Sequence, residues 1–156
     1  MFTASYDRKL HLYLVPLPTG ETLTAPTRPE AEWAYLQAIA PDVAAKAQRI
    51  AATQPALADR VRRAGFIAVE GGVFPCQEPV VYGSHNLSFT CVARIQSQRD
   101  PGMAYAILER DHLYYCDCAD SQGHTTEDGT EEAKAPATKI APHTCKHILA
   151  FVLSGD

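Results

Sequence analysis

The segment YYCDC at residues 114–118 sets two cysteines on either side of one aspartate, and the segment CKHILAFVL at residues 145–153 sets a cysteine and a histidine on either side of one lysine. The first segment ends a stretch of period-two hydrophobic alternation, which is typical of a strand, whereas the second begins an apolar run typical of a buried helix. We expect the two pairs to meet at one metal site that joins a small sheet to the C-terminal helix. The candidate ligands are Cys116, Cys118, Cys145 and His147.

The metal at this site is expected to be zinc. Three thiolates and one imidazole suit a tetrahedral zinc ion, and four protein ligands leave no open position for a catalytic water. The gap between the two pairs, residues 119–144, is 26 residues long. That length is no obstacle, because the entropic cost of closing a loop rises only with the logarithm of its length. We therefore predict one structural zinc ion per chain.

Three other interpretations of these residues stay open. Cys116 and Cys118 can be buried as small apolar side chains without a metal. They can also act as a redox dithiol, although a dithiol would leave the second pair without a role. His143, two residues before Cys145, is the alternative to His147 as a ligand.

The chain has five cysteines, an odd number at modest density, which does not indicate a disulfide framework. Cys91 lies in the middle of an alternating segment, on the same side as Phe89 and Ile95, so we interpret it as a packed thiol. Cys76 follows Pro75 and is also interpreted as structural.

Working outward from these segments, we predict an α+β fold with N-terminal helices, a small antiparallel sheet and a zinc-knuckled C-terminal helix. A short strand is expected at 10–15 and a connecting stretch at 16–29. Thr27 and Glu30 form a capping-box pattern that begins the first helix. Prolines at 41 and 55 begin the next two helices, and Gly65 is expected just after the third.

The sheet is expected between residues 66 and 116. A hairpin is predicted from 66–69 and 73–76 around a Gly71–Gly72 turn, followed by a strand at 87–96 and its partners. The chain is divided into a strand-plus-helices region at 1–79 and a zinc-binding unit at 80–156, which includes an acidic loop at 119–144.

The net charge of −4 hides an uneven distribution of charge. Residues 43–65 carry five cationic side chains and one acidic side chain, whereas residues 119–133 carry five acidic side chains and no Lys or Arg. We expect a basic face near the zinc unit that can bind phosphates. Its candidate residues are Arg60, Arg62, Arg63, Arg94, Arg99 and Lys146. Alternatively, the arginines at 60, 62 and 63 only compensate a helix dipole and Lys146 only points to water.

Residues 120–138 contain no aromatic or branched aliphatic side chain, so we predict a mobile, protease-sensitive segment. In the rival interpretation, Asp128, Glu131 and Glu132 bind a divalent cation, but their spacing is not that of a regular cation-binding loop.

The four candidate ligands resemble the SWIM-type zinc finger, whose pattern is Cys-x-Cys, a variable gap and Cys-x-His. The resemblance covers roughly residues 80–153, about half of the chain, and includes the preceding strands and the closing helix. The gap lies toward or past the long end for the family and is unusually acidic. The resemblance implies a structural zinc module that binds DNA or protein.

The sequence lacks the motifs of several enzyme classes, namely the P-loop, His-Glu-x-x-His and Gly-x-Ser-x-Gly. We therefore predict a non-enzymatic zinc module that binds nucleic acid, DNA in preference to RNA; the alternative is a protein-interaction adaptor in which zinc only maintains the fold. No small-molecule substrate and no membrane partner are expected. Because no apolar run approaches about 20 residues and the segment at 10–17 is too short for a signal peptide, we expect a cytoplasmic protein.

Overall fold

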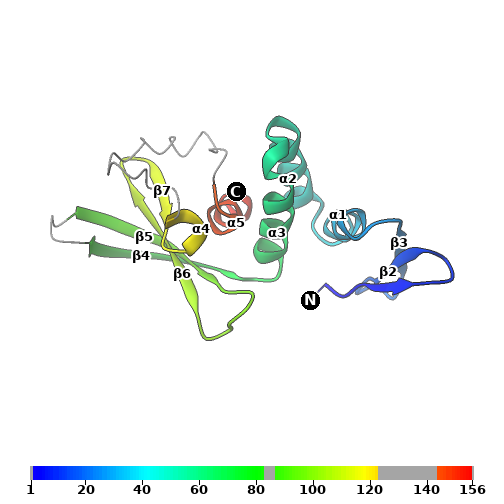
Figure 1. Cartoon of the computed structure of the whole chain (residues 1–156). Coiled ribbons are helices and arrows are strands. Elements are labelled where there is room, and N and C mark those ends of the chain that lie inside the picture. Colours follow the sequence, from blue (N-terminus) through cyan, green and yellow to red (C-terminus); the bar gives the residue numbers. More distant parts are fainter. Residues whose placement is uncertain (1, 83–86, 123–143, 156) are drawn as a thin grey trace.

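The computed structural model describes residues 2–82, 87–122 and 144–155 (Figure 1). Within these ranges the chain forms two antiparallel sheets and several helices, which confirms the predicted α+β class. The first sheet contains β1 (Ser5–Asp7), β2 (Leu12–Pro16) and β3 (Thr22–Ala25). The second contains β4 (Val73–Tyr82), β5 (Leu87–Gln96), β6 (Ala104–Arg110) and β7 (Leu113–Cys116). The helices are α1 (Arg28–Ile39), α2 (Pro41–Thr53), the short 3₁₀ helix η1 (Pro55–Leu57), α3 (Ala58–Val69), α4 (Ala119–Gln122) and α5 (Lys146–Ser154).

The two sheets lie at opposite ends of an elongated molecule, with helices between them (Figure 1). The order of strands in each sheet follows the sequence, so neighbouring strands are joined without crossovers. Helix α5 returns from the C-terminal end of the chain and packs beside α3 and against the four-stranded sheet. This return brings the Cys-x-His segment next to the end of β7.

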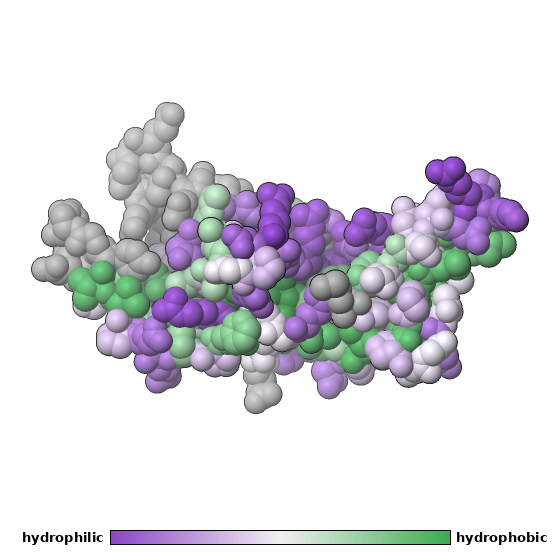
Figure 2. All heavy atoms as spheres, turned by 90° about the horizontal axis from the view of Figure 1, so that it is seen from below, coloured by the Kyte–Doolittle hydropathy of each residue, from purple (hydrophilic) through white to green (hydrophobic). Residues whose placement is uncertain are grey.

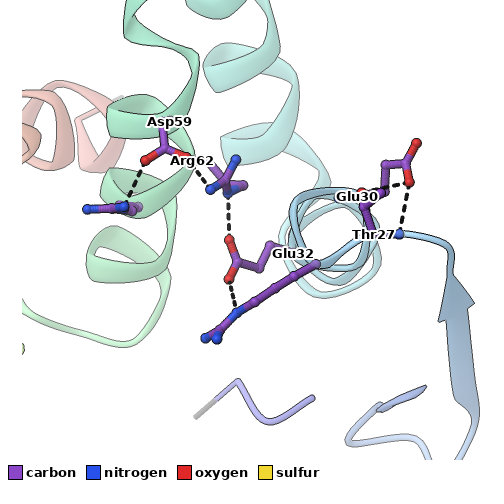
Figure 3. A network of polar contacts seen from close by, with 7 residues as sticks. Thr27, Glu30, Glu32, Asp59 and Arg62 are labelled. Carbon is purple, nitrogen blue, oxygen red and sulfur yellow. Dashed lines mark hydrogen bonds and ion pairs between the residues drawn. The ribbon is translucent and has the colours of Figure 1, made fainter. Parts of the chain in front are cut away.

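The starts of the helices follow the predicted signals. The hydroxyl of Thr27 accepts a hydrogen bond from the backbone N–H of Glu30 at 3.4 Å, and the carboxylate of Glu30 accepts one from the backbone N–H of Thr27 at 3.1 Å. This reciprocal pair is the predicted capping box of α1 (Figure 3). Pro41 begins α2 and Pro55 begins η1, where a missing N–H costs nothing.

The prediction that the third helix stops before Gly65 is wrong, because α3 continues through Gly65 to Val69. Gly65 faces α1 at a close approach: a Cβ atom there would lie 3.0 Å from Cδ1 of Leu36. The glycine is therefore used for helix packing and not as a C-terminal cap. The strand predicted at 66–69 is part of this helix, and the turn into β4 uses Gly71, whose φ of 74° lies in the left-handed region.

The N-terminal region contains more sheet than we predicted. The expected strand at 10–15 is found as β2, but β1 and β3 pair on either side of it. β1 precedes the expected strand, and β3 occupies part of the expected connecting stretch. These strands are short and mostly exposed on one face, so they carry little hydrophobic alternation. Val15 in β2 is fully buried and anchors this sheet on α1.

The strand predicted at 87–96 is confirmed as β5, but its apolar residues do not all share one face. The pairing of β5 with β6 shifts between Cys91 and Ala93, so one extra residue lies in β5. A bulge of this kind reverses the alternation of faces beyond it. Ala93 and Ile95 therefore belong to the large core under α5, whereas Cys91 packs in a smaller cluster on the opposite side.

Two larger cores stabilise the chain, and α3 contributes to both. Phe66 packs with the N-terminal sheet and α1, whereas Ile67 packs in the core that contains α5 and three of the candidate ligands. This second core draws residues from both sides of position 79, and the division of the chain at 79/80 stays a prediction. Within the described ranges, every helix is too short or too polar to cross a membrane.

Candidate metal centre

The four predicted ligands converge at one point inside the molecule. One potential ligand atom from each of them lies within 4.8 Å of every other, and all four residues are buried. They come from the end of β7, from the residue before α4 and from the first turn of α5. Sγ of Cys116 lies 3.8 Å from Nδ1 of His147, although the two residues are 31 positions apart in the sequence. The structure therefore contains a cluster that can hold a metal ion.

The Cys-x-Cys pair is held by the pairing of β6 and β7. Cys116 is the last residue of β7 and pairs with Ile107, which is fully buried. Asp117, between the cysteines, accepts a hydrogen bond from the backbone N–H of Ala106 at 2.9 Å. This bond extends the contact with β6 by one residue and fixes the turn that brings Cys118 to the cluster.

The Cys-x-His pair is positioned by the start of α5. Cys145 is the N-cap residue of this helix, and its carbonyl oxygen accepts a hydrogen bond from the backbone N–H of Leu149 at 3.2 Å. Leu149 and Leu153 are buried against the core, so the apolar face of α5 fixes the direction of its first turn. Three sulfur atoms and one ring nitrogen are thus delivered by elements that pack on each other.

The imidazole of His147 is stacked on the ring of Tyr105, with centroids 4.3 Å apart and planes at 28°. Tyr105 lies in β6, two residues before Ile107, and packs against the core under α5. Tyr105 was not among the residues predicted to belong to the site. The alternation of β6 was the available signal, because it places residues 105 and 107 on the same face.

The cluster favours one thiolate at the start of α5. Hydrogen bonds from the side chains of Cys116 and Cys118 lower the pKa of Cys145 to about 3, and backbone N–H groups of Ile148 and His147 add to this, while burial opposes it. Hydrogen bonding to Cys118 and Cys145, followed by burial, raises the pKa of Cys116 well above its usual range. A thiolate at a helix N-terminus is the form in which cysteine binds a metal.

The donor set fits zinc. Thiolate and imidazole are the ligands of structural zinc sites, at about 2.3 Å for sulfur and about 2.0–2.1 Å for nitrogen. In a tetrahedron, two such sulfurs lie about 3.8 Å apart, and a sulfur and a nitrogen lie about 3.5 Å apart. The observed 3.8 Å between Cys116 Sγ and His147 Nδ1 is close to these values, and every pair among the four ligand atoms lies within 4.8 Å. Burial of all four residues also matches a closed site without a position for water.

The other sulfur atoms lie outside this cluster. Cys91 is fully buried among apolar neighbours, as expected. Its sulfur lies 3.2 Å from that of Cys76, a contact that was not predicted. His143, the alternative ligand, lies outside the described residues, as do Asp128, Glu131 and Glu132. Most of the acidic segment at 119–144 lies outside them as well, although its first residues form α4.

The predicted cationic residues have different surroundings. Arg62 binds Glu32 and Asp59, with its Nε 2.5 Å from Glu32, and its side chain is only 11% exposed (Figure 3). Arg63 also pairs with Asp59, at 2.8 Å, but its side chain is 59% exposed. The Arg62 network joins α3 to α1, so it has a role inside the fold.

The remaining cations are divided among other elements. Arg94 in β5 pairs with Glu78 in β4 at 2.8 Å. Lys146 donates a hydrogen bond to the side-chain oxygen of Gln98 at 3.3 Å. Within the described ranges, the side chains of Arg60 and Arg99 form no ion pair.

Comparisons with known proteins do not extend this picture. No protein-family model matches the chain, and no curated protein and no solved structure matches it either. The metal centre is therefore inferred from the geometry and chemistry of its own four residues.

Proposed function

We propose that this chain is a non-enzymatic binding module whose C-terminal part is organised by a structural zinc ion. The observation that carries the proposal is the convergence of four buried donors within 4.8 Å from segments far apart in the sequence. Its ligands are Cys116, Cys118, Cys145 and His147. The order of these ligands, with strands before them and a helix after them, is the reason to propose a SWIM-type unit.

The proposed zinc site ties the end of β7 to the start of α5. These elements enclose part of the large core, which includes Leu149 and Ile107. Metal binding in small zinc modules supplies about 10–16 kcal/mol of folding free energy. Bound zinc here neutralises the thiolates and fixes the closing helix, and the closed donor set gives it no role in a reaction.

Nucleic acid is the first partner that we propose. Of the six predicted cations, Arg60 and Arg99 form no ion pair within the described ranges, and Lys146 has only the neutral Gln98 as its partner. Lys146 lies between two proposed zinc ligands, at the start of α5. With about three phosphate contacts, log K should fall with log salt at a slope of about −3, since each neutralised duplex phosphate contributes about −0.9.

A protein partner is the second candidate, and the ion pairs favour it. Arg62, Arg63 and Arg94 are each neutralised by carboxylates, which leaves less positive charge for phosphates than the sequence indicated. Phe74 and Met103 are exposed apolar side chains of the second sheet and its β5–β6 turn. On the face shown in Figure 2, hydrophobic residues form separate patches between hydrophilic ones.

Two measurements test the proposal. Elemental analysis of the purified chain should give one zinc ion per chain, and iron or no metal would overturn the zinc centre. Binding to a short DNA duplex at low salt should weaken in the double variant Arg99→Ala/Lys146→Ala, whereas the ion-paired, exposed Arg94→Ala should change it less. If the zinc-loaded chain binds neither DNA nor RNA at low salt, the nucleic-acid partner is refuted. The protein partner is then the remaining proposal, and the proteins that copurify with the chain identify it.

A further inference from the structure

Two cysteines outside the metal centre lie in direct contact. The sulfurs of Cys76 in β4 and Cys91 in β5 are 3.2 Å apart, and both residues are free thiols. The contact is closer than the usual separation of two packed sulfur atoms, and the residues are 15 positions apart in the chain. Neither residue belongs to the cluster of proposed zinc ligands.

Two irregularities of the sheet create this contact. The pairing of β4 with β5 shifts between Pro75 and Glu78, a segment that contains Cys76. The pairing of β5 with β6 shifts just beyond Cys91. Bulges redirect side chains, and here both thiols are directed into the small cluster that contains Leu108 and Phe89.

The two thiols differ in their access to solvent. Cys91 is fully buried, whereas Cys76 is partly exposed at the edge strand β4. A small oxidant can therefore reach Cys76 before it reaches Cys91. This asymmetry is the arrangement of an attacking thiol with a resolving thiol behind it.

We propose that Cys76 and Cys91 form an oxidation site that hydroperoxides convert to an intramolecular disulfide. The Cys76 thiolate attacks one oxygen of hydrogen peroxide, the O–O bond breaks, and the departing hydroxide takes a proton to leave as water. Cys76 is then a sulfenic acid. The Cys91 thiol loses its proton and attacks Sγ of Cys76, the S–O bond breaks, and a second water leaves. The two sulfurs lose two electrons, and one peroxide is reduced to two waters.

The surroundings of Cys76 set the rate of this reaction. Burial, the hydrogen bond with Cys91 and the nearby charges of Cys91 and Glu78 together raise the pKa of Cys76 to about 11, and the charge of Arg94 opposes the change. At neutral pH the thiolate fraction is thus about a hundredfold below that of a thiol with a pKa of 9.0. The site responds to sustained oxidant and not to brief exposure.

The test uses the full chain loaded with zinc. The protein is treated with hydrogen peroxide for increasing times, free thiols are blocked with N-ethylmaleimide, and peptide mapping by mass spectrometry identifies each disulfide. Zinc release is followed in parallel with a chromogenic chelator. The first disulfide should join Cys76 to Cys91, with loss of two hydrogens from the mass of the chain, before zinc is released.

Matched variants separate the two roles. In Cys91→Ala, oxidation should leave Cys76 as a sulfenic acid that dimedone traps, and in Cys76→Ser no such adduct and no early disulfide should form. Disulfide mapping of the unsubstituted chain tests the proposal even where a variant fails to fold. A first disulfide that contains Cys116, Cys118 or Cys145, or Cys76 oxidised to sulfinic acid without a disulfide, would overturn the proposal. If the chain holds no zinc, only the proposed metal centre is refuted, because the Cys76–Cys91 disulfide is detected without reference to the metal.

Discussion

The two ends of the molecule close their cores by different means. At the N-terminal end, Phe2 packs on Tyr35 and Phe66 with ring centroids 5.2 and 5.0 Å away, and Leu36 and Val15 complete an apolar core. At the C-terminal end, the core contains Cys116, Cys118 and Cys145, with His147 among them. The N-terminal core consists of apolar and aromatic side chains, whereas the C-terminal core gathers groups that are poorly satisfied without a metal. The stability of the two ends should therefore respond differently to metal.

The largest effect is expected from loss of a ligand. Cys118→Ser should abolish stoichiometric zinc binding and remove most of the protection of α5 in hydrogen exchange. The effect is large because zinc binding contributes about 10–16 kcal/mol to the folding free energy of small zinc modules. Cys76→Ser is the matched control at a sulfur outside the cluster, and it should retain one zinc per chain. Zinc retained in Cys118→Ser would show that the cluster is not the site.

The second effect concerns the N-terminal core. Leu36 is fully buried in it, so Leu36→Ala should lower the free energy of unfolding by about 2–5 kcal/mol through the cavity it creates. Zinc content should stay at one per chain, because Leu36 does not belong to the core around the ligands. Denaturant unfolding and elemental analysis of the same sample give both numbers. Loss of zinc together with stability would show that the two ends fold as one unit.

A smaller effect is expected at the ion-pair network between α1 and α3. Arg62→Ala should cost about 1–3 kcal/mol, because it leaves the 13% exposed carboxylate of Glu32 without its partner on α3. Arg63→Ala, next to it but 59% exposed, should cost less than about 1 kcal/mol. Thermal unfolding of both variants measures the difference. Equal costs would mean that the network in Figure 3 does not hold the helices together.

The smallest effect is a pH dependence at Cys76. Its pKa is raised from 9.0 to about 11, so the folded chain keeps a proton that the unfolded chain has lost between these values. The contribution to stability is therefore fully present below pH 9 and disappears as the pH rises through 11. Alkylation of Cys76 by iodoacetamide should follow the same curve, with its midpoint about two pH units above that of the unfolded chain. Coincident midpoints would contradict the raised pKa.

The features that were predictable from the sequence are those that depend on local spacing. The capping box of Thr27 and Glu30 and the strand at 87–96 each follow from residues a few positions apart. The meeting of the two ligand pairs was predictable because the spacing inside each pair, Cys-x-Cys and Cys-x-His, is itself local. The end of α3 was missed because Gly65 is a helix-ending signal locally but packs against Leu36, a contact between distant residues. The bulge after Cys91 was missed because alternation alone does not reveal an extra residue.

The neutralisation of the predicted cationic residues also depends on contacts between residues that are distant in the sequence. Arg62 was predicted to contact phosphates because five cations fall close together in the sequence. Its partner Glu32 is 30 positions away, so the neutralisation becomes visible only in the fold. The contact between Tyr105 and His147 was likewise not predictable from local spacing, because it forms only where α5 packs against the sheet.

The most direct test of the proposed zinc centre is hydrogen exchange on the full chain before and after metal removal by a chelator, with zinc counted in both samples. We expect one zinc per chain at the start, loss of protection in α5 and β7 after removal, and retained protection in α1 and the core around Leu36. Re-addition of zinc should restore the original pattern. A chain that holds no zinc, or one whose α5 stays equally protected after the metal is gone, would contradict a C-terminal core organised by zinc.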